Sequence, residues 1–465
     1  MSSSPHQSDE SISRSFDWPV VAAAESFLRS HIESFLEKNS AARALAQRMR
    51  DETATDFFEW IDHLSLFADE ESTLRHLGFI PERVEAPPGA TVWHHPGATF
   101  PRVLVSAPRD RAPSLIALRP EDIADFAGSL GVAGEIGGDP LSPFRRLLVA
   151  EENGTRLEAV ERRAYRGFLI KPLEDGERKS ILAAQELWRT RPRFLENDAD
   201  GMTATNRILE KVLSLVKRDL ACHLFFKEER RYWQSRNRAA QTQKRRQDRL
   251  GLGWGNHDHH TFRCSRAHFV DVNAFLLQLG FEKRERYYAG AEAGWGAQIS
   301  EQPATGIVVF ADVDLKPDET TLDFSSVRLP AAARLGTVGL WVALHGESLL
   351  GAGMHHLECR FDFDLLRQQL QDCGLQMMNP FSNFDFLRQA FTEGERWPVA
   401  AFRAEKLLAA KLITPQQVEK FTREGALGSH LENLQRHGGF KGFNQKSVSA
   451  VITATDPRKN HFAAA

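Results

Sequence analysis

Residues 251–266 read GLGWGNHDHHTFRCSR and place three imidazoles directly before a Thr-Phe-Arg segment. The segment is short enough to form one β-strand, in which successive side chains point to opposite faces. His259, Thr261 and Arg263 then share one face, while Asp258 and His260 point to the other. Arg263 lies about 13 Å along the strand from His259 at the usual rise per residue. An imidazole and a guanidinium on one strand face predict a site that holds a metal and an anionic group of a substrate.

A second imidazole pair, His355-His356, is available on a later β-prone segment. Two histidines and one carboxylate form a facial ligand set that leaves open positions on Fe(II) for oxygen and substrate. The alternative is that His259 is only a hydrogen-bonded side chain of a half-buried strand. Four other histidines are interpreted as structural: His257, His260, His94 and His95.

The composition is typical of a globular protein and excludes several classes. The chain has 465 residues, of which 42% are hydrophobic and 26% charged, enough for two to four domains with buried cores. Its net charge of -3 argues against a dedicated nucleic-acid binder. The basic segment 227–249 is therefore interpreted as a solvated helix with charge pairs rather than as a nucleic-acid arm. No apolar run reaches the roughly 18 residues that a membrane helix needs.

Two further features bear on location and packing. The polar N-terminus, residues 1–18, lacks the apolar core of a signal peptide and is predicted to be disordered. The four cysteines show no paired spacing, which favours the reducing cytoplasm. Phenylalanine, with 31 residues, far outnumbers tyrosine, with 4, and indicates dry cores or an apolar pocket.

Helical and strand patterns divide the chain into four predicted regions. Residues 1–18 are the disordered lead-in, and 19–130 contain helices followed by one strand-rich unit. Residues 131–250 are predicted to be a helical insertion, with helices over 156–166 and 177–190 and a helical block over 203–250. Residues 251–465 are predicted to form the metal-binding catalytic region.

A strand, helix and three strands occur in the same order more than once. Asp62-His63 is followed by Leu77-Gly78-Phe79, as Asp258-His259 is followed by Leu279-Gly280-Phe281, and a weaker copy starts at His355-His356-Leu357. Repeated units of this kind bury their faces against one another. The pattern predicts an α+β fold of repeated βαβββ units, with a curved sheet around a pocket.

The first copy differs from the second at one position that matters for function. Phe67 stands in the first copy where Arg263 stands in the second. We therefore interpret His63 as structural and the second copy as the active one.

Asp258-His259-x-x-Phe262-Arg263 resembles the DHxxFR signature of the 2-oxoadipate dioxygenase/decarboxylase family, a branch of the vicinal oxygen chelate superfamily. His355-His356-Leu357 resembles the NHxT-like strand that carries the family's second metal histidine. The segment RHGGF at 436–440 resembles its RRDGFE-like C-terminal segment. The similarity covers most of residues 256–315 and 350–446, and 40–107 resemble a degenerate copy of the family's start.

This resemblance implies a non-haem Fe(II) held by two histidines and one glutamate. Carried over, His259 and His356 are metal ligands, and Arg263 is the catalytic residue that binds the substrate. The family's glutamate lies in a late strand, where the segment 397–405 of this chain has alanine near the matching position. Glu405 is the expected third ligand, with Glu395 as the alternative.

The expected function is that of a cytoplasmic Fe(II)-dependent dioxygenase/decarboxylase. It would convert a small 2-oxo carboxylic acid, such as 2-oxoadipate, and O2 to a 2-hydroxy acid and CO2. The substrate and O2 are the expected partners, without a membrane or nucleic acid. The alternative is a non-catalytic protein of the same fold that binds a ligand or partner and has lost the metal glutamate.

Overall fold

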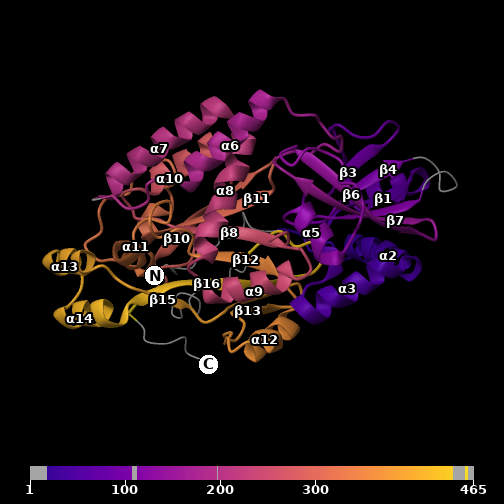
Figure 1. The fold of residues 1–465 in the computed structure, drawn as a ribbon. Helices are drawn as coiled ribbons and strands as arrows, with labels where there is room; N and C mark the ends of the chain where they lie inside the picture. Colours follow the sequence, from indigo (N-terminus) through magenta and orange to yellow (C-terminus); the bar gives the residue numbers. More distant parts are fainter. Residues whose placement is uncertain (1–17, 107–112, 196, 444–455, 459–465) are drawn as a thin grey trace, which may run out of the picture.

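The computed structural model describes residues 18–106, 113–195, 197–443 and 456–458. These residues form two mixed β-sheets, which lie in different halves of the molecule and carry helices on their outer faces (Figure 1). The predicted disordered lead-in lies outside the described residues except for its last position, Trp18.

The N-terminal half contains a seven-stranded sheet with the strand order β2-β3-β4-β1-β5-β7-β6. Its strands are β1 (Ile61–Phe67), β2 (Ile80–Glu82), β3 (Thr91–His94), β4 (Arg102–Ser106), β5 (Ser114–Leu118), β6 (Phe144–Glu152) and β7 (Thr155–Arg162). With helix α4 (Glu71–His76), the first four strands form one βαβββ unit, in which β1 pairs with β4 in parallel. The remaining strands and α5 (Ile123–Leu130) form a shorter βαββ unit, joined to the first by the antiparallel pair β1 and β5.

The C-terminal half contains a nine-stranded sheet, in which eight strands run in the order β13-β14-β16-β12-β8-β11-β10-β9. Its strands are β8 (His257–Arg263), β9 (Glu282–Tyr288), β10 (Trp295–Gln302), β11 (Ile307–Asp314), β12 (His356–Arg360), β13 (Ser382–Phe384), β14 (Leu387–Phe391), β15 (Glu395–Trp397) and β16 (Ala426–Arg436). The short strand β15 pairs with β16 beside this path.

Two βαβββ units meet at the centre of this second sheet. In the first, β8 is followed by α10 (Phe269–Gln278) and the meander β9-β10-β11, and β8 pairs with β11 in parallel. In the second, β12 is followed by α12 (Phe363–Asp372), and β12 pairs with β16 in parallel. The antiparallel pair β8 and β12 joins the two units. The predicted α+β fold of repeated βαβββ units is confirmed.

The turn after the helix explains why the units that begin with β1 and β8 are recognisable as a repeat in the sequence. Gly280 follows α10 with φ 86°, and Gly78 holds the matching position after α4 with φ 88°. This left-handed backbone is unfavourable for residues with a Cβ, so glycine is placed where the chain reverses into the next strand. The phenylalanine after each glycine is buried in the core.

The prediction of a helix over 156–166, in the predicted helical insertion 131–250, is wrong. Residues 144–162 form the antiparallel hairpin β6-β7 at the edge of the first sheet. The segment TRLEAVER contains Leu, Glu, Ala and Arg, which all favour helices, but sheet pairing overrides that weak local preference. The helical part of this region begins at residue 175.

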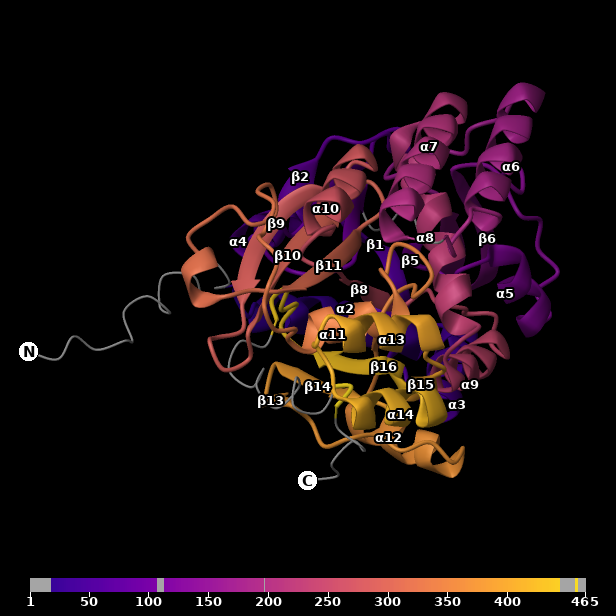
Figure 2. The same cartoon turned by 90° about the vertical axis from the view of Figure 1, so that its left-hand side faces the viewer.

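Four helices follow that hairpin and cover the second sheet on one side (Figure 2). They are α6 (Asp175–Arg189), α7 (Asp198–Leu215), α8 (Arg218–Gln234) and α9 (Arg238–Asp248). The predicted helices at 177–190 and 203–250 are thus confirmed. Phe226 of α8 packs against the ring of Phe262 on β8, with ring centres 6.0 Å apart. The basic segment 227–249 is not a fully solvated helix, because Arg230, Trp233 and Gln243 are buried.

Helices at both ends of the chain complete the outer layer. The predicted helical stretch 19–50 forms α2 (Ala22–Lys38) and α3 (Ser40–Thr53), and α11 (Thr337–His345), α13 (Ala401–Ala409) and α14 (Pro415–Glu424) flank the second sheet. Within the described ranges, none of the helices has the length and apolar character that crossing a bilayer requires.

Candidate metal centre

Strand β8 carries the histidine-rich segment, and its two faces have different neighbours. His260 and Phe262 face α8, where the His260 ring lies 4.9 Å from that of Phe226. Thr261 and Arg263 face the opposite side and line a cavity. His259 lies on their face and is 1% exposed, with its ring 4.4 Å from that of Phe443.

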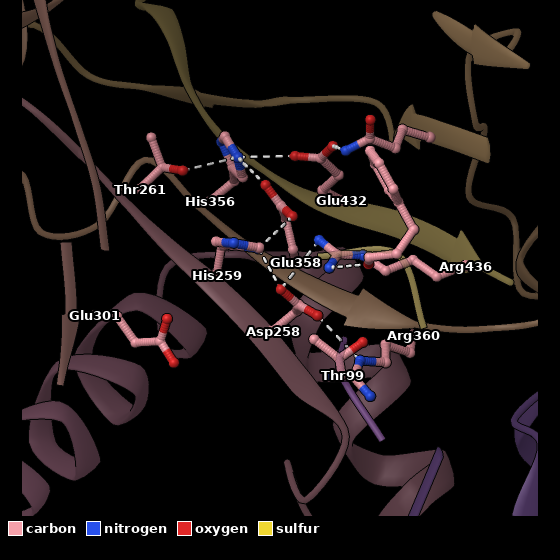
Figure 3. A network of polar contacts seen from close by, with 12 residues as sticks. Thr99, Asp258, His259, Thr261, Glu301, His356, Glu358, Arg360, Glu432 and Arg436 are labelled. Carbon is pink, nitrogen blue, oxygen red and sulfur yellow. Dashed lines mark hydrogen bonds and ion pairs between the residues drawn. The ribbon is translucent and has the colours of Figure 1, made fainter. Parts of the chain in front are cut away.

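Four side chains from three neighbouring strands converge beside this face: His259 on β8, His356 and Glu358 on β12, and Glu432 on β16 (Figure 3). His356 Nε2 lies 2.8 Å from Glu432 Oε2 and 3.8 Å from Glu358 Oε1. The other oxygen of Glu358 lies 3.0 Å from His259 Nδ1. His356 Nε2 is also 3.0 Å from the Thr261 hydroxyl. All four cluster residues are buried.

The register of the sheet explains this convergence. The tripeptide His-Leu-Glu occurs at 356–358 on β12 and again at 430–432 on β16. The two strands pair in parallel with the tripeptides side by side, so Glu358 lies opposite Glu432 and His356 opposite His430. Side chains in register project from the same face of a sheet, which brings the two carboxylates together.

Burial and mutual contact give the two carboxyl groups different properties. Burial by itself raises the pKa of each, but the charge of His259 lowers the pKa of Glu358 below its ordinary value. Burial and the negative charge of Glu358 together raise the pKa of Glu432. Although burial opposes it, hydrogen bonds to the glutamates raise the pKa of His356 to about 9. The cluster therefore attracts positive charge, as protons or as a metal cation.

Asp258 links the cluster to a surrounding set of charges (Figure 3). Its carboxylate contacts His259 Nδ1 and accepts hydrogen bonds from Arg360 Nε at 3.0 Å and Arg436 Nη2 at 3.4 Å. Arg360 also donates to Glu59, which precedes β1, at 2.9 Å. A carboxylate held on a histidine in this way fixes the orientation of its ring.

Arg263 lies along β8 from the cluster, buried in the wall of the same cavity. Its Nε is 3.6 Å from Oδ2 of Asp312, which pairs with it across β8 and β11. Burial raises the pKa of Asp312 to about 7, although the charge of Arg263 opposes this shift. Arg263 and Asp312 therefore place a guanidinium group and a weakly acidic carboxyl group side by side in the cavity wall.

The cavity has a volume of about 100 Å³, with polar and aromatic parts. His356, Glu358, Glu432 and Arg263 contribute to its polar part. Six aromatic rings form much of the remaining wall: Tyr287, Trp295, Phe310, Phe381, Phe391 and Phe443. Within the described part of the chain, Arg263 is the only lysine or arginine in this lining.

The structure brings three of the four predicted site residues to this region and excludes the fourth. His259 and His356 both contact Glu358, and Arg263 lines the adjoining cavity. Glu405 is an exposed side chain on helix α13 rather than on a strand, so its selection was wrong. The alternative, Glu395, lies at the start of β15 and accepts a hydrogen bond from the Arg238 backbone at 2.6 Å.

Sequence reasoning missed Glu358, Glu432 and Asp312. The repeated His-Leu-Glu tripeptide was a usable signal for both glutamates, because the second copy lies four residues before the family-like segment at 436–440. No comparable local pattern marks Asp312, whose position depends on the pairing of β8 with β11.

The N-terminal copy of the site differs in its chemistry. His63 Nδ1 lies 2.7 Å from Asp62, and Arg162 donates to both oxygens of Asp62 at 2.7 and 2.8 Å. Burial lowers the pKa of His63 despite the nearby carboxylate. Among the residues that the structure describes, no group of three potential metal ligands includes His63. The interpretation of His63 as structural stays a prediction.

The solved structures reported below are distant matches to this chain. No protein-family model matches the sequence, and no curated protein matches it significantly. A solved mutant of 4-hydroxymandelate synthase from Streptomyces coelicolor is 14% identical and covers 86% of this chain and 98% of its own, with a TM-score of 0.28. Methylmalonyl-CoA epimerase from Mycobacterium tuberculosis is 12% identical and covers 39% of this chain and 88% of its own, with a TM-score of 0.23. A xylose isomerase-like TIM barrel/4-hydroxyphenylpyruvate dioxygenase fusion protein is 10% identical, covers 86% of this chain and 52% of its own, and has a TM-score of 0.23.

Proposed function

We propose that the protein is a non-haem Fe(II)-dependent dioxygenase that acts on a small 2-oxo carboxylic acid. In the proposed reaction, one O2 is consumed, the substrate carboxylate leaves as CO2, and the product is a 2-hydroxy acid one carbon shorter. The observation that carries the proposal is the buried group of two histidines and two glutamates beside a cavity that also contains Arg263. The DHxxFR resemblance supports the same reaction.

The donor set fits Fe(II). Two imidazoles and a carboxylate suit this ion and leave coordination positions for substrate and O2. His259 Nε2 and His356 Nδ1 are buried without a hydrogen-bond partner among the described residues. We assign His259, His356 and Glu432 as the ligands: His356 and Glu432 form one group of potential ligands with Glu358, and Glu358 also contacts His259. Glu358, in contact with both imidazoles, orients them.

Iron, when bound, supplies coordination of the 2-oxo acid and electron transfer with O2. The chain's own side chains bind and position the substrate and exclude water. Arg263 donates hydrogen bonds to the substrate carboxylate and holds the reacting carbons beside the ligand cluster. Asp312 limits the movement of Arg263, since the two side chains are neighbours across the sheet. The aromatic wall keeps bulk water away from the reacting atoms.

The lining of the cavity favours a substrate with an apolar tail over 2-oxoadipate itself. A second carboxylate would require a second cation, and the described lining offers only Arg263. The aromatic rings instead supply apolar contact area. We therefore expect 4-methyl-2-oxopentanoate or phenylpyruvate to give a higher kcat/KM than 2-oxoadipate.

The test measures iron content together with turnover. Wild-type protein reconstituted with Fe(II) is expected to consume O2 and release CO2 in equal amounts with one of these 2-oxo acids. His259→Ala and His356→Ala should lose both bound iron and turnover. Full iron occupancy in both variants would refute the ligand assignment, and absence of O2 consumption by iron-loaded wild-type protein with all three acids would refute the reaction.

The alternative of a non-catalytic binding protein depended on the loss of the metal glutamate. Glu358 and Glu432, which lie beside His356, support the catalytic function over this alternative. Elemental analysis of protein purified without chelator still separates the two functions, because the binding protein would contain no stoichiometric iron.

A further inference from the structure

A second cavity lies behind β8, on the side of this strand that faces α8. It has a volume of about 200 Å³ and is lined from both halves of the molecule. Arg119, at the end of β5, comes from the first half, while His223, Lys227 and Arg230 come from α8. The loop that leads into β8 contributes Trp254, and His257 is the first residue of β8 itself.

Most acidic side chains around this cavity already have partners. Lys244 lies 3.2 Å from Glu121 and 2.6 Å from Asp248. Glu161 contacts Arg163 and, at 2.8 Å, Arg145.

The lining contains six Lys or Arg side chains and five Asp or Glu side chains, so its positive charges exceed its negative charges by one. Arg162 is held by Asp62 at 2.7 Å. Asp122 caps α5 by accepting the backbone N–H groups of Ala124 and Asp125. Of the acids, only the exposed Asp125 has a side chain without a described partner.

Two arginines in the lining have no carboxylate partner. Arg230 is 5% exposed, and its Nη1 lies 3.4 Å from His260 Nε2. Its Nε is buried without a hydrogen-bond partner among the described residues. Arg119 is half-buried, and within the described ranges its guanidinium forms neither an ion pair nor a hydrogen bond. Buried guanidinium groups are normally paired, because desolvation of an unpaired charge is costly.

We propose that this cavity is a binding site for a small oxyanion, either a carboxylate or a phosphate, held by Arg119 and Arg230. A guanidinium group presents parallel N–H donors that match the paired oxygens of both anions. Lys227, exposed on α8 at the cavity, adds charge that attracts the anion. The volume of about 200 Å³ suits a small ion. The site is independent of the proposed iron chemistry, since none of these three residues lines the first cavity.

The test uses the full chain and two probes, inorganic phosphate and malonate, titrated by calorimetry at constant ionic strength. Wild-type protein should bind at least one probe saturably with one site per chain. Arg119→Gln and Arg230→Gln should each weaken binding by about tenfold or more, the loss expected from one charge-assisted contact. Arg178→Gln is the matched control, because this arginine forms ion pairs with Asp139 and Asp175 outside the cavity.

Each outcome has a defined meaning. Binding of phosphate alone, of malonate alone or of both identifies the anion chemistry and supports the site. No saturable binding by the wild type, or unchanged affinity in Arg119→Gln, would overturn the proposal. Because Arg230 is buried and its replacement can impair folding, the half-buried Arg119 provides the decisive variant. Arg263→Gln should retain phosphate or malonate binding, which separates this site from the first cavity.

Discussion

Glu358 and Glu432 are two acidic side chains buried against each other on neighbouring strands. Two carboxyl groups this close cannot both be ionised unless a cation lies beside them. In the absence of a metal, the imidazolium forms of His259 and His356 supply that positive charge. The identities of His259, His356 and Arg263 could be predicted from local patterns. The third proposed ligand, Glu432, could not be predicted in this way, because its position beside His356 depends on which strand pairs with β12. Glu405 occupies a helix, where no such pairing occurs.

The variant Glu432→Gln tests the assignment of Glu432 as an iron ligand, and Glu405→Gln is its matched control. Each removes one negative charge from the chain with little change in shape. Glu432→Gln should reduce bound iron at least about tenfold, because a neutral amide is a weak ligand for this cation. Glu405→Gln should bind iron like the wild type. Equal iron content in both variants, measured by elemental analysis after dialysis, would contradict the assignment of Glu432.

Arg263→Gln tests the anchor for the substrate. We expect kcat/KM for the 2-oxo acid to fall about ten- to hundredfold, as for the loss of a charged hydrogen bond, while iron content stays unchanged. Steady-state O2 consumption and elemental analysis on the same preparation provide the two measurements. A variant that loses iron in parallel with activity would show that Arg263 supports the cluster rather than the substrate.

At the scale of elements, the βαβββ unit was recognisable because its turns have strict backbone requirements. A glycine with left-handed backbone followed by a buried phenylalanine marks the end of the unit helix in both α4 and α10. Strand β7 was mistaken for a helix because its residue types favour helices and both of its faces are largely buried, which removes the usual alternation. Local propensity is weak against the hydrogen bonds of a complete sheet.

Gly280→Ala should destabilise the fold more than Gly290→Ala. Both glycines have positive φ, 86° and 92° respectively, so each substitution carries the left-handed backbone cost of about 1–2 kcal/mol. A Cβ at Gly280 would also lie 3.0 Å from Arg218 Nε, whereas a Cβ at Gly290 would meet no atom within 4 Å. Urea denaturation provides the comparison. Equal losses would show that only the backbone matters at Gly280.

At the scale of the whole molecule, the C-terminal segment holds the two halves together. Gly438 accepts a hydrogen bond from the Val21 backbone at 2.7 Å, and Gly439 accepts one from Thr99 at 2.9 Å. Glu25 on α2 accepts the Gly438 backbone N–H and also contacts Arg29 and His437. Although burial opposes it, hydrogen bonds from His437 and Arg29 lower the pKa of Glu25 from 4.5 to about 2.

The contacts of the Glu25 carboxylate make the stability of the fold depend on pH in the acid range. Because the pKa of Glu25 is lower in the folded chain, its stabilising effect is complete above about pH 4.5 and disappears as the pH falls toward 2. Glu25→Gln should therefore flatten the dependence of the urea midpoint on pH over that window. Glu33→Gln, a change on the same helix, is the control and should keep the wild-type slope. An unchanged slope in Glu25→Gln would contradict the role of this carboxylate.

The three proposed iron ligands come from positions 259, 356 and 432, on strands that meet only when the second sheet is assembled. A partly folded chain lacks this arrangement, so iron would bind the native state in preference to the unfolded one. Free Fe(II) at a hundred times its dissociation constant would then add about 2.7 kcal/mol to the free energy of unfolding. The melting temperature should rise with iron in the wild type and not in His356→Ala. The proposed ligand set is therefore complete only after the last strand, β16, has paired with β12, because β16 carries Glu432.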